Sequence, residues 1–295
     1  MRAQRIAVIG GGAVGGALAA AAQDTGHEVV LCVRTPFEVL VLDTPDGRRE
    51  VPMPIITDPA QAGPVDWVLV TTKVQDVGGT GAWLRAFDAE NTPVVAVQNG
   101  VEHHDSLAPL LARSPVLPAL LYGGTERVRA GHVRRHSAKL RMVVPAGTLG
   151  ERLTAVLSDP EVTATDDFRT DAWRKMLTNL AANPISALTM RRLDVFADGE
   201  VMALAKAVVA EGVEVGRAEG AVLGTTDAEQ AIKAFEVLAP GTGTSMLYDR
   251  EAGLRTEHEH ITGALVRAAR RHGIPVPRNE TLLTLLRALP ENARR

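Results

Sequence analysis

The chain has 295 residues, of which 45% are hydrophobic and 23% are charged, and its formal net charge is -3. This length and apolar content are enough for two domains, or one large one, built around a hydrophobic core. The small net charge and the 3% of aromatic residues argue against a basic surface for nucleic acid. The single cysteine, Cys32, excludes an intrachain disulfide and fits a reducing compartment. Its place in an apolar run predicts a small core residue rather than a reactive thiol.

The N-terminal residues 1–23 imitate a secretory signal peptide, because they combine two arginines, an uncharged stretch and an alanine run. The alternative is a strand, a glycine turn and a helix. The β-branched run IAVIG, the glycine spacing and a second predicted strand at 28–33 favour this alternative. No other apolar run approaches the length of a membrane span. We therefore expect a soluble, cytoplasmic protein without a membrane partner.

A glycine-rich turn follows the first predicted strand, RIAVIG. Its Gly10, Gly12 and Gly15 match the pattern G-x-G-x-x-G. In dinucleotide-binding folds the first glycine permits a tight turn, the second lets the backbone approach a pyrophosphate, and the third allows close packing of helix on strand. The helix predicted at 13–25 points its positive N-terminal end at the phosphates. The sequence therefore predicts a dinucleotide-binding loop made of Gly10, Gly11, Gly12, Ala13, Val14 and Gly15.

An arginine occupies the place where NAD-binding folds usually have an acidic residue. The second predicted strand, 28–33, ends within the sequence LCVRT, which has no carboxylate. Arg34 stands at the position where the acidic residue is expected. A guanidinium suits a ribose 2′-phosphate, so the sequence favours NADPH over NADH. The alternative is a solvated arginine at a strand end, and the missing acid argues against it.

Two further strands are predicted to end in polar residues. The strand at 65–73 ends in Lys73, and the strand at 92–100 ends in Gln98-Asn99-Gly100. Ligands of open parallel sheets lie beyond the carboxyl ends of the strands, so Lys73 and Asn99 are candidate cofactor contacts. A solvated loop lysine and the turn chemistry of Asn-Gly are the alternatives. The other elements predicted here are hairpins at 38–53 and 123–140, the second exposed and charge-rich, strands at 115–123 and 140–145, and a helix near 149–158.

After about residue 166 the strand patterns stop and helical patterns follow. Helices are predicted at 168–188, 199–220, 227–238, 245–253, 257–272 and 279–288. An α/β unit followed by a helical unit is a familiar dehydrogenase layout, with the reaction between the two. We therefore predict an α/β fold with an N-terminal Rossmann-type dinucleotide-binding domain at 1–166 and an all-helical substrate domain at 167–295.

The first of these helices has one polar side. Lys175, Asn179 and Asn183 span an arc of about 80° at about 100° per residue, while apolar residues such as Leu177 occupy the other side. Asparagine is a poor residue for a helix interior, so its repetition indicates hydrogen bonding rather than solubility. The alternative is a solvated face on which Asn183 ends the helix, and Pro184 favours a kink just after it.

The stretch TSMLYDREAGLRTEHEH contains the last group of candidates. Ser245 begins a short helix after a glycine-rich loop. Thr256 and the glutamate three residues later have capping-box spacing, which predicts Glu257 in the first turn of the next helix. The helix dipole alone could account for a carboxylate there. His258 and His260 would diverge by about 200° on a helix, so we predict no metal site.

Five motifs in this order resemble the ketopantoate reductase (2-dehydropantoate 2-reductase) family over nearly the whole chain. They are G-x-G-x-x-G at 10–15, the lysine of LVTTK, QNG, K-x-x-x-N-x-x-x-N from Lys175, and TSMLYD followed by RTE. Their order and spacing are more specific than any one motif. The resemblance implies NADPH-dependent reduction of a 2-oxo acid to a 2-hydroxy acid, as in pantothenate synthesis.

The resemblance also implies a role for each candidate residue. Lys175 would be the general acid that protonates the nascent alkoxide, and Glu257 would bind the substrate hydroxyl or orient the lysine. A positioned ammonium both stabilises the charge that hydride arrival builds on oxygen and supplies the proton. The substrate contacts would be Asn99, Asn179, Asn183 and Ser245, and the cofactor contacts would include Arg34, Lys73, Asn99 and Glu257.

One departure from the family pattern bears on the substrate. Residues 132–142 are unusually basic and lack the glycines that members usually have in this hairpin. This leaves open a related reductase that acts on another ketone or on an imine. A non-catalytic NADP(H)-binding regulator is a third hypothesis, and the presence of Lys175, two asparagines and Glu257 together argues against it. Helical second domains of this kind often dimerise, so a homodimer is compatible with the sequence.

Overall fold

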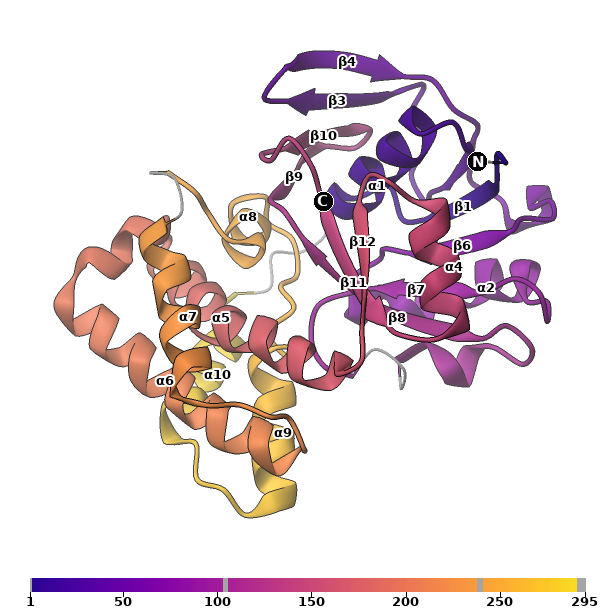
Figure 1. The fold of residues 1–295 in the computed structure, drawn as a ribbon. Coiled ribbons are helices and arrows are strands. Elements are labelled where there is room, and N and C mark those ends of the chain that lie inside the picture. The colour runs from indigo at the N-terminus through magenta and orange to yellow at the C-terminus, as the bar shows by residue number, and fades with distance from the viewer. Residues whose placement is uncertain (1, 103–105, 238–240, 291–295) are drawn as a thin grey trace. The chain divides into compact units, whose positions relative to one another are not determined.

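The computed structural model describes residues 2–102, 106–237 and 241–290 (Figure 1). The chain forms two compact units. Unit 1 consists of Met1–Gln98 and His103–Phe168, and unit 2 consists of Asn99–Glu102 and Arg169–Arg295. The short segment Asn99–Glu102 therefore belongs to the helical unit, whereas the sequence analysis assigned it to the first domain.

Unit 1 contains an eight-stranded sheet with the order β12-β11-β8-β7-β6-β1-β2-β5. The six strands from β8 to β5 are parallel to their neighbours, β11 is antiparallel to β8, and β12 is parallel to β11. The bounds are β1 Arg5–Ile9, β2 Glu28–Cys32, β5 Ile55–Ile56, β6 Trp67–Val70, β7 Val94–Val97, β8 Val116–Tyr122, β11 Arg141–Pro145 and β12 Glu161–Thr165.

Helices cover both faces of this sheet, which explains why its central strands are apolar throughout. Ile6 and Val8 of β1 share one core with α1 (Ala13–Asp24) and α4 (Thr148–Val156). Ala7 and Ile9, which point to the opposite face, share another core with α2 (Gly81–Phe87). The predicted Rossmann-type α/β fold is confirmed.

The two predicted hairpins are present and together form a second sheet with the order β4-β3-β10-β9. This sheet lies against α1 (Figure 1), with Val133 packed on Ala20 and Leu40. The description of residues 123–140 as exposed is therefore wrong for β10, because its parallel pairing with β3 buries His132 and Val133. The bounds are β3 Leu40–Thr44, β4 Gly47–Val51, β9 Thr125–Arg129 and β10 His132–Arg135.

Most basic groups of β10 are matched by carboxylates within unit 1. Arg135 lies 2.8 Å from Asp159, and Arg134 lies 3.2 Å from Glu126. His132 lies 3.0 Å from Asp43. The basic groups of β10 therefore form ion pairs inside the unit.

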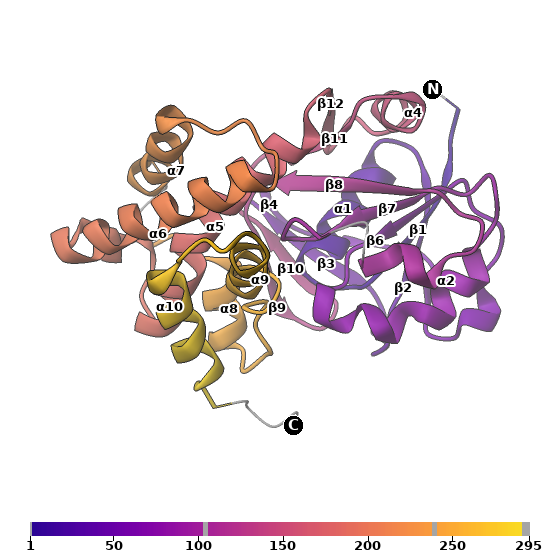
Figure 2. The same cartoon turned by 90° about the horizontal axis from the view of Figure 1, so that it is seen from below.

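Unit 2 is helical, as predicted. Its α6, α9 and α10 pack on one another (Figures 1 and 2) around a core that also includes α5. The bounds are α5 Phe168–Thr189, α6 Gly199–Ala218, α7 Thr225–Val237, α8 Ser245–Glu251, α9 Thr262–His272 and α10 Pro277–Arg287.

One predicted helix begins later than expected. The helix predicted from 257 begins at Thr262, because residues 257–261 form a turn in which the N–H groups of His260 and Ile261 donate to the Glu257 carbonyl at 3.0 Å. The predicted capping box is therefore wrong, and Glu257 is not in a helix. The end of α5 agrees with the predicted helix at 168–188, because the residues after Asn183 are buried in the core and the helix continues through Pro184 to Thr189. The alternative in which Asn183 ends the helix is therefore wrong.

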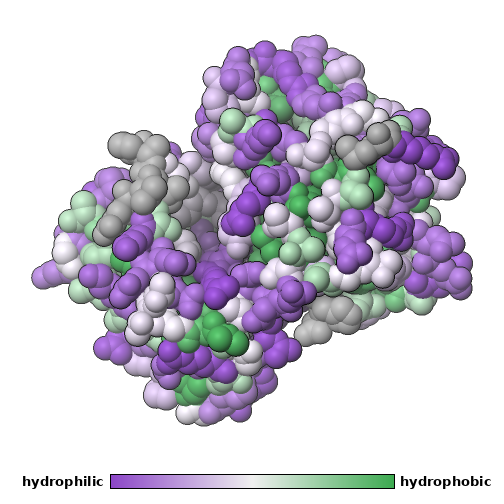
Figure 3. Space-filling view, in the orientation of Figure 1, coloured by the Kyte–Doolittle hydropathy of each residue, from purple (hydrophilic) through white to green (hydrophobic). Residues whose placement is uncertain are grey.

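Cys32 is buried, and burial raises the pKa of its thiol to about 12, as expected for a small core residue. Hydrophilic residues cover most of the face drawn in Figure 3, with smaller hydrophobic areas among them. Within the described residues, none of the helices combines the length and apolarity needed to cross a membrane.

Candidate active site

The glycine-rich loop has the geometry that a pyrophosphate requires. Gly10 has a φ of +109°, which favours glycine. A Cβ on Gly15 would lie 1.8 Å from the Gly10 carbonyl oxygen, so only glycine permits this packing of α1 on β1. A Cβ on Gly12 would meet nothing within 4 Å, and no side chain caps the start of α1. The first N–H groups of α1 and the open space beside Gly12 fit a bound phosphate.

Arg34 and Lys73 occupy the same edge of the sheet as this loop. Gly10, Arg34 and Lys73 follow the carboxyl ends of β1, β2 and β6, which are adjacent parallel strands. Arg34 is exposed, and Lys73 is half-buried at the start of a 3-10 helix, Val74–Thr80. The described residues of unit 1 thus combine a glycine-rich loop with two cations at the edge where ligands of this fold bind.

In unit 2, one asparagine connects the candidate lysine to the candidate glutamate. Lys175 Nζ donates to Asn99 Oδ1 at 3.3 Å, and Asn99 Nδ2 donates to Glu257 Oε2 at 3.1 Å. A carboxamide has one accepting and one donating end, so the two charged neighbours determine the orientation of this amide. Glu257 is buried, with 6% of its surface exposed. The structure therefore joins three residues that are far apart in the sequence.

The environment of Lys175 changes its acidity. Burial lowers the pKa of Lys175 to about 8, and the Glu257 carboxylate acts in the opposite direction. The side chain is therefore mostly an ammonium at neutral pH, yet it releases a proton more readily than an exposed lysine. Both properties suit a general acid.

A second polar contact lies further along α5. The side chain of Asn183 is 2% exposed, and its Oδ1 accepts from Ser245 Oγ and from the Met246 N–H, both at 3.4 Å. The side-chain carbonyl of Asn183 is therefore bound to the beginning of α8. Asn179 lies one turn before Asn183 and is half-buried. The backbone contact of Asn183 was not predicted, because nothing local in the sequence links residues 63 positions apart.

Hydroxyl groups hold α8 at this place. Thr244 caps the helix by accepting the Leu247 N–H at 3.1 Å. Its Oγ1 also lies 2.7 Å from Ser186 Oγ, which is buried on α5. These contacts connect α8 to α5 and so determine where Ser245 stands. Ser245 was predicted from the sequence but the adjacent cap was not, although a threonine before a short helix is a typical N-cap.

The segment that carries Asn99 packs on the turn that carries Glu257. Gly100 has a φ of +98°, as the alternative based on Asn-Gly turn chemistry expects, and a Cβ there would lie 2.8 Å from the His260 carbonyl oxygen. Arg267 also binds Glu102 at 2.8 Å. Asn99 is thus held beside Glu257 by backbone packing as well as by its side chain.

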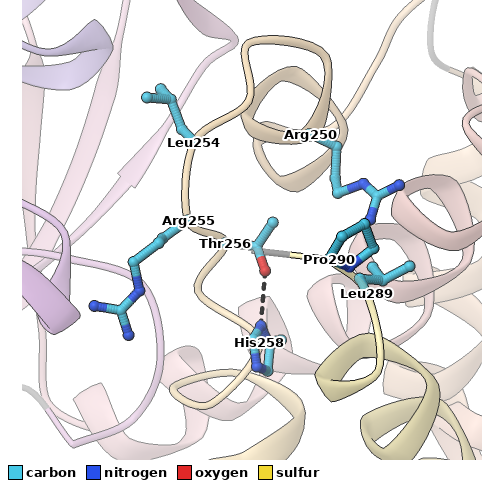
Figure 4. A pocket seen from close by; sticks show the side chains of 7 residues that line it. All are labelled: Arg250, Leu254, Arg255, Thr256, His258, Leu289 and Pro290. Atoms are coloured by element: carbon cyan, nitrogen blue, oxygen red, sulfur yellow. Dashed lines mark hydrogen bonds between the residues drawn. The ribbon is translucent and has the colours of Figure 1, made fainter. Parts of the chain in front are cut away.

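A small cavity of unit 2 is lined in part by Thr256 and His258, the residues on either side of Glu257 in the sequence. It has a volume of about 120 Å³ and is shown in Figure 4, where Thr256 and His258 face each other across a 2.7 Å contact. Its lining contains neither Lys175 nor Asn99 nor Glu257. The cavity is therefore separate from the lysine, asparagine and glutamate contacts. The complete lining consists of Arg250, Leu254, Arg255, Thr256, His258, Leu289 and Pro290.

A dinucleotide loop on a Rossmann unit, followed by a helical unit with a half-buried lysine, defines a nicotinamide-dependent oxidoreductase. Residues 6–148 match the family model described as Ketopantoate reductase PanE/ApbA, and residues 167–290 match the one described as Ketopantoate reductase PanE/ApbA C terminal. The chain belongs to the ketopantoate reductase family, as its five motifs predicted.

Relatives over the full length agree with this assignment. The 2-dehydropantoate 2-reductase of Caulobacter vibrioides is 38% identical, over 96% of this chain and 98% of the relative. The crystal structure of a PanE/ApbA family ketopantoate reductase from Ralstonia eutropha JMP134 has a TM-score of 0.86 and 33% identity, and covers 96% of this chain and 97% of its own. D-mandelate dehydrogenase, solved with NADH and anilino(oxo)acetate, has the same fold at 19% identity, with a TM-score of 0.86 and coverage of 96% and 97%.

Proposed function

We propose that this chain reduces a 2-oxo acid to a 2-hydroxy acid with NADPH, and that the reaction is that of ketopantoate to pantoate in pantothenate biosynthesis. The observation that carries the proposal is the half-buried Lys175, with a pKa of about 8, connected through Asn99 to Glu257. The name of the Caulobacter relative supports the choice of substrate. We expect the protein to act in the cytoplasm, and a homodimer remains compatible with it.

The residues of unit 1 account for the cofactor. The backbone of Gly10, Gly11, Gly12, Ala13, Val14 and Gly15 would hold the pyrophosphate. Arg34 would pair with a 2′-phosphate, which NADPH has and NADH lacks, and Lys73 would supply a second positive charge at the same sheet edge. When bound, the nicotinamide supplies the hydride. Asn99 and Glu257 would complete the cofactor contacts.

Lys175 holds the proton that the reaction consumes. As the carbonyl carbon of the substrate gains a hydride, its oxygen gains negative charge, and the Lys175 ammonium both stabilises that oxygen and donates a proton to it. Glu257 keeps the lysine protonated at neutral pH, because its negative charge raises the pKa of the lysine. Asn99 lies between the two charged groups, and its hydrogen bond with Lys175 orients the ammonium.

The remaining polar groups would bind the substrate. Asn179 is a half-buried residue on the same helix as Lys175 and offers a carboxamide. Ser245 is exposed at the start of α8 and offers a hydroxyl. The Asn183 carbonyl is occupied by α8, so its contact with substrate would use the amide N–H groups. Together these donors suit the carboxylate and hydroxyl of a 2-oxo acid.

The test is NADPH oxidation by the purified protein with ketopantoate and with a panel of other 2-oxo acids, ketones and imines. We expect ketopantoate to give the highest kcat/KM, and Lys175→Ala to lower kcat by at least about a hundredfold. Lys206→Ala, which changes an exposed lysine of the same unit, is the matched control. A higher kcat/KM for another acceptor would identify that acceptor as the substrate in place of ketopantoate. NADPH binding without reduction of any acceptor would support a regulator instead.

A further inference from the structure

We propose that Thr71 is a positioning residue of the dinucleotide-binding loop. Thr71 follows β6 and has 9% of its surface exposed. Its Oγ1 lies 3.0 Å from both the Ile9 and the Gly10 carbonyl oxygens. The Ile9 carbonyl also accepts the backbone N–H of Thr71 at 3.0 Å. Because the Ile9 carbonyl keeps this backbone donor, loss of the hydroxyl would mainly affect the hydrogen bonding of the Gly10 carbonyl, at the start of the loop.

The loop is built around this hydroxyl. A Cβ on Gly15 would lie 2.3 Å from Thr71 Oγ1, and a Cβ on Gly10 would lie 3.1 Å from it. The hydroxyl thus occupies the space that these two glycines leave empty. The third glycine of the motif, Gly12, faces open space instead. Two of the three motif glycines therefore make room for Thr71 as well as for the packing of α1 on β1.

The contact determines the direction of a phosphate-binding donor. In a planar trans peptide the C=O and N–H bonds point in opposite directions. When Thr71 holds the Gly10 carbonyl toward α1 and β6, the N–H of Gly11 in the same peptide must point away from them. A hydrogen-bond donor that is already oriented costs less to bind than one that must be ordered by the ligand. Thr71 therefore fixes the Gly11 N–H for a pyrophosphate without touching the cofactor.

The test compares NADPH affinity among hydroxyl variants, measured by fluorescence titration of the intact protein. We expect Thr71→Val to weaken NADPH binding by about tenfold, since one buried carbonyl loses its donor, and Thr71→Ser to restore most of the affinity. Thr71→Cys, with a weak donor of similar size, should lie between the two. This test rests on the proposed cofactor, so NADPH binding by the wild-type protein is measured before the variants are compared.

Thr92→Val separates positioning from stability. Thr92 is a second buried threonine of unit 1, with 8% exposure, and its hydroxyl donates to the Val65 carbonyl at 3.1 Å. Both valine variants should lower the Tm of the ligand-free protein by similar amounts, but only Thr71→Val should change the NADPH dissociation constant. Equal NADPH affinity in Thr71→Val and Thr92→Val, with wild-type binding intact, would overturn the proposal. Failure of the wild type to bind NADPH would instead overturn the proposed cofactor.

Discussion

Replacing Glu257 by glutamine should make the proton donor more acidic. The two hydrogen bonds of Asn99 and the width of its amide place the Lys175 nitrogen and the bound Glu257 oxygen no more than about 9 Å apart. At an effective dielectric constant of about 20, unit charges at this distance attract by roughly 2 kcal/mol, which is more than a tenfold change in a proton-dissociation constant. We therefore expect Glu257→Gln to lower the pKa of Lys175 from about 8 to roughly 7.

The pH dependence of kcat/KM for ketopantoate measures this change in the free enzyme. The reaction needs protonated Lys175, so activity should decline above about pH 8 in the wild type and above roughly pH 7 in Glu257→Gln. Glu251→Gln is the control, because Glu251 is a carboxylate of the same unit that pairs with Arg192 at 2.8 Å. An alkaline limb that stays in place in Glu257→Gln, or that moves to higher pH, would refute the electrostatic role of Glu257.

Three further predictions concern the same two units. Lys175→Met should abolish most activity and, at pH 7, raise the free energy of unfolding by at most about 3 kcal/mol. Because the pKa of folded Lys175 lies below its ordinary 10.5, wild-type stability rises with pH between about 8 and 10.5. In urea unfolding, the stability advantage of Lys175→Met should therefore decline over this pH range and vanish at its upper end. Gly100→Ala should lower kcat by roughly tenfold or more, because its Cβ would lie 2.8 Å from the His260 carbonyl and displace Asn99; unchanged kcat in a destabilised variant would contradict this. Arg34→Glu should raise the KM for NADPH by roughly tenfold, while the KM for NADH stays the same or falls. An equal rise of both KM values would argue against a contact with the 2′-phosphate.

Local patterns were sufficient for the elements of this fold that are long and periodic. The glycine motif between β1 and α1, the apolar central strands and the arc of Lys175, Asn179 and Asn183 are all properties of neighbouring residues. The missed elements are short or at an edge, such as β5 with two residues, β12, and α2 with seven. Such elements depend on pairing and packing partners more than on their own sequence.

The contacts of the candidate site depended on residues that are distant in the sequence. Thr256 and Glu259 have capping-box spacing, yet the turn at 257–261 closes on the Glu257 carbonyl and the helix begins only at Thr262. That turn directs the Glu257 side chain to Asn99, which is 158 positions away. No periodicity could show that Asn99 belongs to the helical unit, since its neighbours before it form a strand of the sheet.

The orientation of the proton donor depends on two glycines in another helix. A Cβ on Gly212 of α6 would lie 2.9 Å from the side chains of Leu177 and Leu180, and one on Gly216 would lie 3.0 Å from Trp173. Each glycine costs about 1 kcal/mol of helix stability relative to alanine, and in return α6 approaches the apolar side of α5 closely. Because that side is held against α6, α5 cannot turn about its axis, and its polar arc keeps Lys175 at Asn99. The glycines of α6 therefore fix the rotation of the helix that carries Lys175, which we propose as the proton donor.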